Sequence, residues 1–220
     1  MKAMQFIIYQ ILLVMKPPSP QRGNPKLIQS ASLMTKIELR LKYKKLRHQF
    51  SENDIDEMSL AIANQILKLD IWNKTYFHVF LPIETQNEIN TEFILHILQG
   101  KDKEIVVSKS NFETLEMTHY LLTDNTKIKI NKHNIPEPIE GLEVPVSKID
   151  VVFVPLLAYD IKGNRVGYGK GFYDKFLSKC KPETIKIGLS FFKPEDLILN
   201  VYDNDVKLDY CIIPNKIYNF

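Results

Sequence analysis

Residues 151–154 are apolar at every position, and this run constrains the fold more than any other stretch of the chain. A strand with one face in water alternates apolar and polar residues, so a continuous apolar run predicts a central strand that is covered on both faces. Other β-type runs lie at 76–81, 104–107, 115–120, 185–189 and 210–213. Helical patterns at 92–98 and 172–180 separate several of them. Strands that alternate with helices predict an α/β domain with a largely parallel sheet.

Two helices are predicted ahead of the first strand. The first has an apolar face at helical spacing, formed by Leu39, Tyr43, Leu46 and Phe50. A second face of the same helix is basic and contains Lys36, Arg40, Lys44 and Arg47. The other helix is expected to begin at Ser51, because Ser51 and Asp54 have the spacing of a capping box. Its buried face would be formed by Ile55, Met58, Ile62, Ile66 and Leu69.

The start of the chain differs in composition from the rest. Residues 4–15 are mostly apolar and are followed by a segment rich in proline. The run is shorter than the about 20 apolar residues that a transmembrane helix needs. It has the length of the hydrophobic part of a signal peptide, but the small residues 30–32 lie far beyond it, so export is the weaker alternative. We interpret residues 1–33 as an N-terminal extension outside the fold, with translation starting at Met34, and residues 34–220 as a single domain.

The charge balance excludes some classes of protein. The 220 residues contain 29 Lys and Arg against 26 Asp and Glu, a net charge of +3. This excess is too small for a dedicated nucleic-acid-binding protein, although a local basic patch remains possible. The two cysteines, Cys180 and Cys211, offer no disulfide framework and favour a reducing compartment, so we expect the protein in the cytoplasm. The five histidines show no metal-ligand spacing, and we interpret them as surface or core residues.

Half of the eight glycines lie in one segment, which follows the predicted central strand and precedes a predicted helix. They are Gly163, Gly167, Gly169 and Gly171. Glycine lets backbone N–H groups approach a ligand, and N–H groups at a helix N-terminus attract anions. Because Arg165 and Lys170 add positive charge, the segment predicts a polyphosphate site. It is not a Walker A loop, since Lys170 is followed by glycine rather than by Ser or Thr, and a turn that merely connects strand to helix is the alternative.

The sequence VPLLAYDIKGNRVGYGKGFYDKFL, residues 154–177, resembles the signature of the 5-formyltetrahydrofolate cyclo-ligase family. Shorter similarities follow in the family's order: TKIELR at 35–40, FLP at 80–82, NEINTEFI at 87–94, NIPEP at 134–138 and NDVKLD at 204–209. The resemblance implies a three-layer α/β/α sandwich with a largely parallel mixed sheet, similar to the ribose-phosphate isomerase and CoA-transferase-like folds. It also implies an enzyme that uses ATP and Mg²⁺ to convert 5-formyltetrahydrofolate to 5,10-methenyltetrahydrofolate, with release of ADP and phosphate.

This reaction requires the protein to position the substrates and to neutralise charge, and it does not require a nucleophilic side chain. The formyl group is amide-like and a poor electrophile, but phosphorylation of its oxygen creates a good leaving group. The neighbouring amine of the folate can then close the ring and expel phosphate. Phosphoryl transfer depends mainly on orientation and on stabilisation of the γ-phosphate charge. The sequence, accordingly, offers no evident side-chain nucleophile.

The resemblance assigns a set of residues to ATP. Lys36 and Arg40 match a Lys-x-x-x-Arg pair that binds its phosphates, and their spacing puts both on one helix face. The glycine-rich segment matches the ATP-binding residues Arg165, Val166, Gly167, Tyr168, Gly169, Lys170, Gly171, Phe172 and Tyr173. Within it, Arg165 and Lys170 are expected to be catalytic by offsetting charge during the transfer. Tyr168 stands where many relatives carry arginine, which argues against a cationic role at this position.

Metal and folate residues are implied in the same way. Asp174 and Asp205 match carboxylates that bind Mg²⁺, an ion that usually takes one or two protein carboxylates together with phosphate oxygens and water. Glu88 matches an acid that contacts the folate, and Glu84 is the alternative, because the loop before Glu88 is longer than in relatives. The other folate-binding candidates are Phe80, Leu81, His133 and Tyr168. Residues 134–138 are expected to form a rigid loop beside the folate, since two prolines fix the backbone there.

Two other functions remain as alternatives. A phosphosugar isomerase or a CoA-transferase-like enzyme on a similar fold would need a positioned general base or a nucleophilic glutamate, and no motif for either is clear. A non-enzymatic nucleic-acid binder would use the basic face of helix 36–47. We expect small-molecule partners, namely 5-formyltetrahydrofolate and ATP, and a monomer without nucleic-acid or membrane partners.

Overall fold

The computed structural model describes residues 33–220. Our interpretation of residues 1–33 as an extension, and the alternative of export, fall on residues outside this range except for Leu33. Within the described range, no helix combines the length and the apolar character that crossing a membrane requires.

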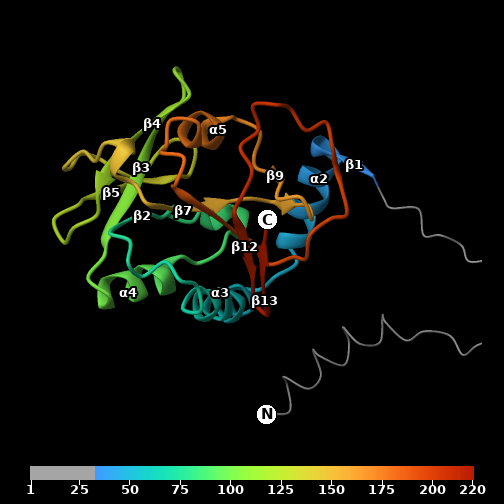
Figure 1. Cartoon of the computed structure of the whole chain (residues 1–220), viewed down its shortest axis with the longest axis horizontal. Coiled ribbons are helices and arrows are strands. Elements are labelled where there is room, and N and C mark those ends of the chain that lie inside the picture. Colours follow the sequence, from blue (N-terminus) through green and yellow to red (C-terminus); the bar gives the residue numbers. More distant parts are fainter. Residues whose placement is uncertain (1–32) are drawn as a thin grey trace, which may run out of the picture. The chain divides into compact units, whose positions relative to one another are not determined.

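A seven-stranded sheet forms the centre of the fold (Figure 1). Its strands in spatial order are β13 (Lys216–Asn219), β12 (Tyr210–Ile213), β10 (Ile185–Leu189), β7 (Val151–Pro155), β2 (Tyr76–His78), β3 (Glu104–Asn111) and β4 (Glu116–Leu121). The five inner strands are parallel to one another, and the edge strands β13 and β4 pair antiparallel with their neighbours. The prediction of an α/β fold with a largely parallel sheet is therefore confirmed.

The α-helices among residues 33–220 are α2 (Lys36–Arg47), α3 (Glu52–Ile66), α4 (Glu92–Gly100) and α5 (Phe172–Leu177). Helix α3 begins at the predicted capping box, in which Ser51 and Asp54 bond each other's backbone N–H groups. Helix α2 begins with a second capping box, formed by Thr35 and Glu38, which we did not predict. Helix α5 ends at Leu177 rather than at residue 180, and the chain turns before Pro182, because proline disfavours helical conformation in the residue that precedes it.

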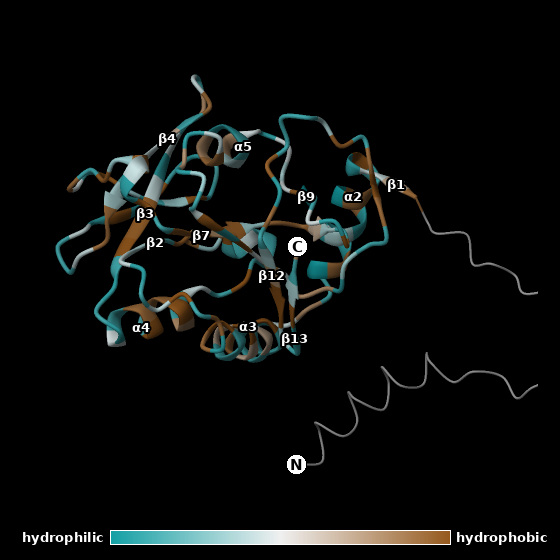
Figure 2. Cartoon of the chain, viewed as in Figure 1, coloured by the Kyte–Doolittle hydropathy of each residue, from teal (hydrophilic) through white to brown (hydrophobic). Residues whose placement is uncertain are grey.

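The central strand β7 is buried on both faces. Val151 and Phe153 belong to the core cluster under α3 and α4, whereas Val152 and Val154 pack on the opposite face with side chains of α5. Figure 1 shows α3 and α4 on one side of the sheet and α5 on the other. Figure 2 shows hydrophobic colour along β2 and β3 and mainly hydrophilic colour in the connecting loops. Successive side chains of a strand point to opposite faces, so an uninterrupted apolar run needs cover on both of them, as predicted for residues 151–154.

Three small sheets were not predicted. Strand β1 (Met34–Thr35) pairs with β11 (Ile198–Leu199), β5 (Ile128–Ile130) with β6 (Pro136–Pro138), and β8 (Ala158–Tyr159) with β9 (Arg165–Val166). Segments of two or three residues are too short to carry a periodic pattern. Residues 134–138, which we expected as a loop, thus include the strand β6, and its two prolines are tolerated because each strand of a two-stranded sheet is an edge. The β8–β9 hairpin fixes the start of the glycine-rich segment at Arg165.

Candidate active site

A cavity of about 430 Å³ opens at the carboxyl ends of β2, β3 and β7. This edge of a parallel sheet is where ligands commonly bind. The predicted residues that line it are Lys36, Arg40, Phe80, Leu81, Glu88, His133, Arg165, Gly167, Tyr168, Gly169, Lys170, Gly171, Phe172, Tyr173, Asp174 and Asp205. Val166 is the exception, because its side chain is buried in the core cluster that contains Leu39 and Tyr43 of α2. The structure thus brings the predicted residues together around one cavity, and the role of each stays a prediction.

The glycine-rich segment folds against helix α2. Arg40 Nε donates a hydrogen bond to the backbone oxygen of Gly167 at 2.9 Å. Gly169 has a φ of +88°, and a Cβ there would lie 3.0 Å from Arg40 Cζ, so the close approach to the guanidinium depends on glycine. Gly163, which we grouped with the ligand-binding glycines, does not line the cavity and instead packs against the ring of Phe220.

Arg165 is a buried cation on the wall of the cavity, only 8% exposed. Its Nη2 donates to Asp174 Oδ1 at 2.7 Å, whereas Nη1 is buried without a hydrogen-bond partner among residues 33–220. Burial lowers the pKa of Arg165, and the carboxylates of Asp174 and Asp205 oppose that shift. A buried guanidinium with an unpartnered N–H group is suited to an anionic ligand, which would supply the missing acceptor.

Asp205 faces the cavity from the segment before β12 and meets the first turn of α2. Its Oδ2 forms an ion pair with Lys36 Nζ and accepts a hydrogen bond from the backbone N–H of Tyr202 at 2.6 Å. Among the described residues, no protein donor bonds Asp205 Oδ1 or Asp174 Oδ2. The same part of the chain contains no group of three or more potential metal-ligating side chains. Two carboxylates with free oxygens fit Mg²⁺, which completes its shell with water and phosphate oxygens.

Lys170 and Lys44 add charge nearer to the solvent. Lys170 is exposed and lies on the rim of the cavity. Lys44, which we noted only as part of a basic helix face, also lines the cavity, and its Nζ lies 5.3 Å from the centre of the Tyr168 ring. The basic face of α2 is therefore turned in part toward the cavity rather than toward solvent.

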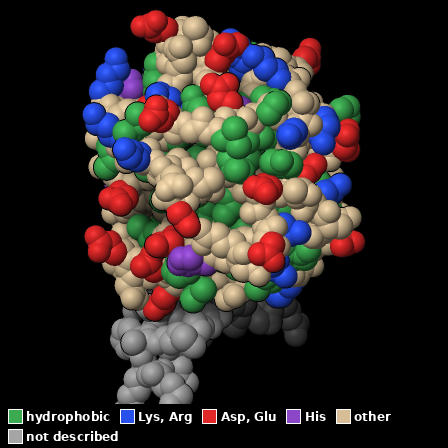
Figure 3. Space-filling model, turned by 90° about the vertical axis from the view of Figure 1, so that its left-hand side faces the viewer, with side chains coloured by type: hydrophobic (Ala, Val, Ile, Leu, Met, Phe, Trp, Pro, Cys, Tyr) green, Lys and Arg blue, Asp and Glu red, His purple; other side chains and the backbone are tan. Residues whose placement is uncertain are grey.

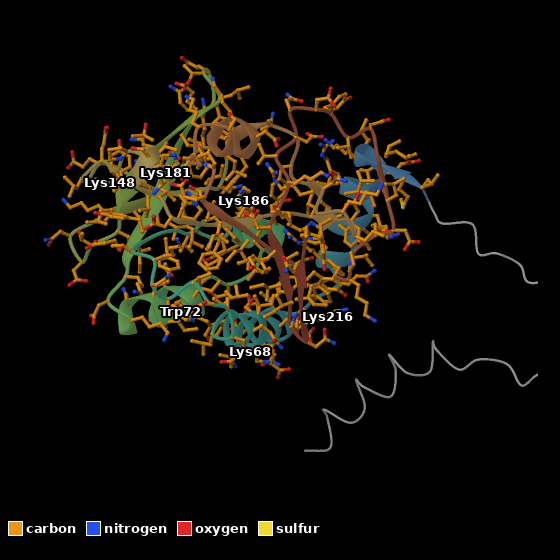
Figure 4. The ribbon with its side chains drawn as sticks, viewed as in Figure 1. Lys68, Trp72, Lys148, Lys181, Lys186 and Lys216 are labelled. Atoms are coloured by element: carbon orange, nitrogen blue, oxygen red, sulfur yellow. The ribbon has the colours of Figure 1, made fainter. Side chains whose placement is uncertain are left out.

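Lysines on other parts of the surface do not add to this positive region. Lys148, Lys181 and Lys186, labelled in Figure 4, lie outside the cavity. Lys181 pairs with Asp150 at 3.2 Å and Lys186 with Asp209 at 2.9 Å. Figure 3 shows acidic, basic and hydrophobic side chains interspersed on the face that it presents. This mixed surface agrees with the small net charge.

Glu88 is the acid at the inner end of the cavity, 6% exposed. Its Oε2 accepts a hydrogen bond from the backbone N–H of Ile83 at 2.7 Å, and its Oε1 accepts one from the Tyr168 hydroxyl at 2.7 Å. Burial raises the pKa of Glu88, and the charge of Arg47 together with the two hydrogen bonds acts in the opposite direction. Glu84, the alternative from the sequence, lies in the exposed 3₁₀ helix η1 (Glu84–Gln86) and does not reach the cavity.

Two loops and the start of α5 contribute aromatic rings to the outer wall. His133 stacks on Phe112 with ring centres 3.9 Å apart, and Phe112 meets the edge of Phe172 at 5.0 Å. His133 comes from the β5–β6 connection, Phe112 from the β3–β4 turn and Phe172 from the start of α5. Phe112 was not predicted, because a single aromatic residue in a turn carries no periodic or motif signal.

A buried polar cluster behind the cavity was also missed. Ser108 lines the cavity, and its Oγ lies 2.5 Å from His78 Nε2 and 3.3 Å from His119 Nδ1. Burial and the neighbouring His119 lower the pKa of His78, and burial and Lys179 lower the pKa of His119 to about 4. Both imidazoles are therefore neutral at pH 7. These two histidines are core residues and His48, His96 and His133 are exposed, in line with our interpretation of them as surface or core residues.

Comparisons with known proteins agree on one family. Residues 33–214 match the model of the 5-formyltetrahydrofolate cyclo-ligase family. The 5-formyltetrahydrofolate cyclo-ligase of Haemophilus influenzae is 27% identical over 161 residues, which is 70% of this chain and 84% of the relative. The enzyme of that name from Mus musculus is 27% identical over 195 residues, 83% of this chain and 93% of the relative. The NMR structure of Aquifex aeolicus 5,10-methenyltetrahydrofolate synthetase superposes with a TM-score of 0.71 at 26% identity, covering 84% of this chain and 92% of that one.

Proposed function

The chain belongs to the 5-formyltetrahydrofolate cyclo-ligase family, and we propose that the cavity described above is where it converts 5-formyltetrahydrofolate to 5,10-methenyltetrahydrofolate at the expense of ATP. One observation carries the proposal, namely that the cations Lys36, Arg40 and Arg165 and the buried acid Glu88 share a single cavity. Cations suit the triphosphate, and a carboxylate suits the amino and ring N–H donors of a pterin.

In this proposal the triphosphate lies between α2 and the glycine-rich segment. Lys36 and Arg40 bind its phosphates from the helix, and the backbone N–H groups of residues 166–173 bind them from the segment. Arg165 offers its unpartnered Nη1, and Lys170 is free to move toward the γ-phosphate because it is exposed. These two residues have the catalytic role of offsetting the charge that is redistributed during phosphoryl transfer.

Mg²⁺ is part of the proposal because the donor set fits it. Asp174 and Asp205 would hold the ion, whose chemistry is to neutralise and orient the phosphate oxygens. Their present partners, Arg165 and Lys36, hold both carboxylates at the cavity wall.

The folate occupies the other end of the cavity. Glu88 accepts hydrogen bonds from the pterin, Phe80 and Leu81 contact the flat ring, and Tyr168 borders both substrates. His133, through its stack on Phe112, covers the outer side. Aromatic and aliphatic walls with one fixed carboxylate are a common design for recognising a flat heterocycle.

The reaction then needs no side-chain nucleophile. The formyl oxygen attacks the γ-phosphorus, and the bond between this phosphorus and the β–γ bridging oxygen breaks to release ADP. The neighbouring folate nitrogen attacks the activated formyl carbon and loses its proton, which the departing phosphate can accept. The C–O bond to the phosphate breaks as the ring closes. The contribution of the protein is to hold the two substrates in line and to exclude water from the activated intermediate.

The test is direct. Purified protein is mixed with ATP, Mg²⁺ and 5-formyltetrahydrofolate, and the absorbance of the methenyl product is followed while ADP is measured in parallel. We expect equal amounts of methenyl product and ADP, and no product when ATP or Mg²⁺ is omitted. Absence of product from folded protein would overturn the proposal.

Further properties belong to the same proposal. We infer a three-layer α/β/α sandwich of the ribose-phosphate isomerase type, in which residues 34–220 form one domain. We also infer a monomer in the cytoplasm, with small molecules rather than nucleic acids or membranes as partners. Size-exclusion chromatography with light scattering tests the monomer, and an oligomer at low concentration would contradict it.

A further inference from the structure

Arg47 is a buried cation at the end of α2, 2% exposed, and it does not line the cavity. Its Nη1 donates a hydrogen bond to the Tyr168 hydroxyl at 3.1 Å, and its Nη2 donates to the backbone oxygen of Leu156. The side chain of Asn87, next to Glu88, donates to the backbone oxygen of Arg47 at 3.0 Å. Arg47 is therefore joined both to the loop that carries Glu88 and to the tyrosine that contacts Glu88.

The direction of these hydrogen bonds follows from chemistry. A guanidinium can only donate hydrogen bonds, so the Tyr168 hydroxyl oxygen accepts one from Arg47. The single proton of this hydroxyl is then donated to another acceptor. That acceptor is Glu88 Oε1, 2.7 Å away. Because the backbone N–H of Ile83 donates to the other oxygen, Glu88 receives two hydrogen bonds and donates none. The remaining lone pairs of the Glu88 carboxylate can therefore only accept hydrogen bonds from a ligand in the cavity.

We propose that Arg47 is a positioning residue that acts through Tyr168 and holds the Glu88 carboxylate as a hydrogen-bond acceptor for the N–H donors of the folate. The inference rests on the proposed function and adds a residue that lies one contact behind the cavity wall. Loss of the guanidinium would free the tyrosine proton to point elsewhere and would remove the cation whose charge lowers the pKa of the buried Glu88 carboxyl group.

The surrounding charges agree with this assignment. Burial raises the pKa of Glu88, whereas Arg47 lowers it. The other titratable groups that face this carboxyl are Tyr168 from the glycine-rich segment and Tyr173 from α5, and burial raises the pKa of both, so they remain protonated. Lys44 of α2 lies beyond the Tyr168 ring. Arg47 is thus the cation whose removal would shift Glu88 toward its protonated form.

Three variants test the inference: Arg47→Met, Arg47→Lys and Tyr168→Phe. Hydrogen bonds to charged groups contribute about 1.5–3 kcal/mol, which corresponds to about tenfold or more in binding. For Arg47→Met and Tyr168→Phe we expect the folate KM to rise by about tenfold, with the ATP KM changed by less than about twofold. Arg47→Lys, which keeps the charge, is expected to recover part of the loss. The Arg47→Met/Tyr168→Phe double variant should be no worse than the poorer single variant, because both break the same chain of hydrogen bonds.

The pH dependence of folate binding is a second measurement, and loss of packing alone would not change it. Equilibrium binding of 5-formyltetrahydrofolate without ATP should weaken at low pH as Glu88 protonates, and in Arg47→Met this weakening should begin at higher pH. Tyr43→Phe is the matched control, because Tyr43 is a buried tyrosine of α2 whose hydroxyl donates to Glu195 at 2.7 Å outside the cavity. It should leave the folate KM and the pH profile unchanged.

The possible failures are distinguishable. If the wild-type protein forms the methenyl product but Tyr168→Phe binds folate like wild type at every pH, the role of Arg47 is refuted while the proposed function stands. An equal rise of both KM values would also refute it, because this would indicate general loosening of the cavity. If the wild-type protein forms no product and binds no folate, both fail. Tyr168→Phe retains the ring packing, so it decides the matter even if Arg47→Met does not fold.

Discussion

Acidification from pH 7 to pH 5 is expected to destabilise the fold through two buried imidazoles. His78 is fully buried and His119 is 3% exposed. Burial holds the pKa of both below the ordinary value, and that of His119 at about 4. In the unfolded chain, both titrate near a pKa of about 6.5. Below that pH the unfolded state takes up protons that the folded state does not, so the free energy of unfolding falls as the pH falls.

The interval between the two pKa values sets the size of the effect. One pKa unit corresponds to about 1.4 kcal/mol, so His119 alone lowers the free energy of unfolding by about 2 kcal/mol between pH 6.5 and pH 5. His78 also keeps its neutral form, because burial lowers its pKa, and so it acts in the same direction. The contribution of His119 alone is a substantial part of the about 5–15 kcal/mol by which most domains are stable.

Urea unfolding at pH 7, 6 and 5 measures this loss. In His119→Gln the loss between pH 7 and pH 5 should be smaller than in wild type by about 2 kcal/mol. The control His96→Gln replaces an exposed histidine of α4 and should leave the slope of stability against pH unchanged. An NMR titration of the folded protein, in which the His119 ring signals stay constant down to pH 5, checks the cause directly. If His119→Gln lost as much stability as wild type over this range, or if the His119 ring titrated near pH 6.5, the reasoning would be refuted.

Three substitutions and one control substitution extend the predictions to the cavity. Lys170→Ala should lower kcat by roughly 100-fold through loss of charge stabilisation, with little change in thermal unfolding, and an unchanged kcat would contradict the catalytic role of the glycine-rich segment. Glu88→Gln should raise the folate KM more than the ATP KM in steady-state assays. The opposite order would mean that the ends of the cavity assigned to folate and to ATP are the wrong way round. Gly169→Ala should destabilise the protein by about 1–3 kcal/mol in urea, because of its positive φ and the 3.0 Å approach to Arg40, whereas Gly167→Ala, where a Cβ meets open space, should cost less.

Much of the fold was predictable because its main helices and strands are long enough to show a periodic pattern of apolar and polar residues. Local sequence patterns that extend over a helical turn or a whole strand predicted three features. These are the apolar face of α2, the capping box of α3 and the uninterrupted apolar run in β7. The two-residue strands β1, β8, β9 and β11 have no such pattern, because they form only where tertiary contacts bring their partners together. Helix α5 was predicted too long for a related reason, since Cys180 still packs against the core after the helix has ended at Leu177.

The cavity was predictable where its residues cluster in a motif and not where they converge from distant segments. The segment around Arg165 and Lys170 carries its own signature of glycines and cations. Arg47 and Tyr168 are 121 positions apart in the sequence, and Tyr168 and Glu88 are 80 positions apart. No local spacing in the sequence predicts hydrogen bonds between such distant residues. The choice between Glu84 and Glu88 likewise depended on a backbone turn at Asn87, whose φ of +46° points the following side chain inward.

The ion pair between Lys36 and Asp205 joins two segments that lie 169 positions apart in the chain. It fixes the first turn of α2 against the segment before β12. Local unfolding of either segment would therefore break the ion pair and open one side of the cavity. If the proposed function holds, a substrate that contacts both segments should accordingly protect both of them against proteases at once, rather than one before the other.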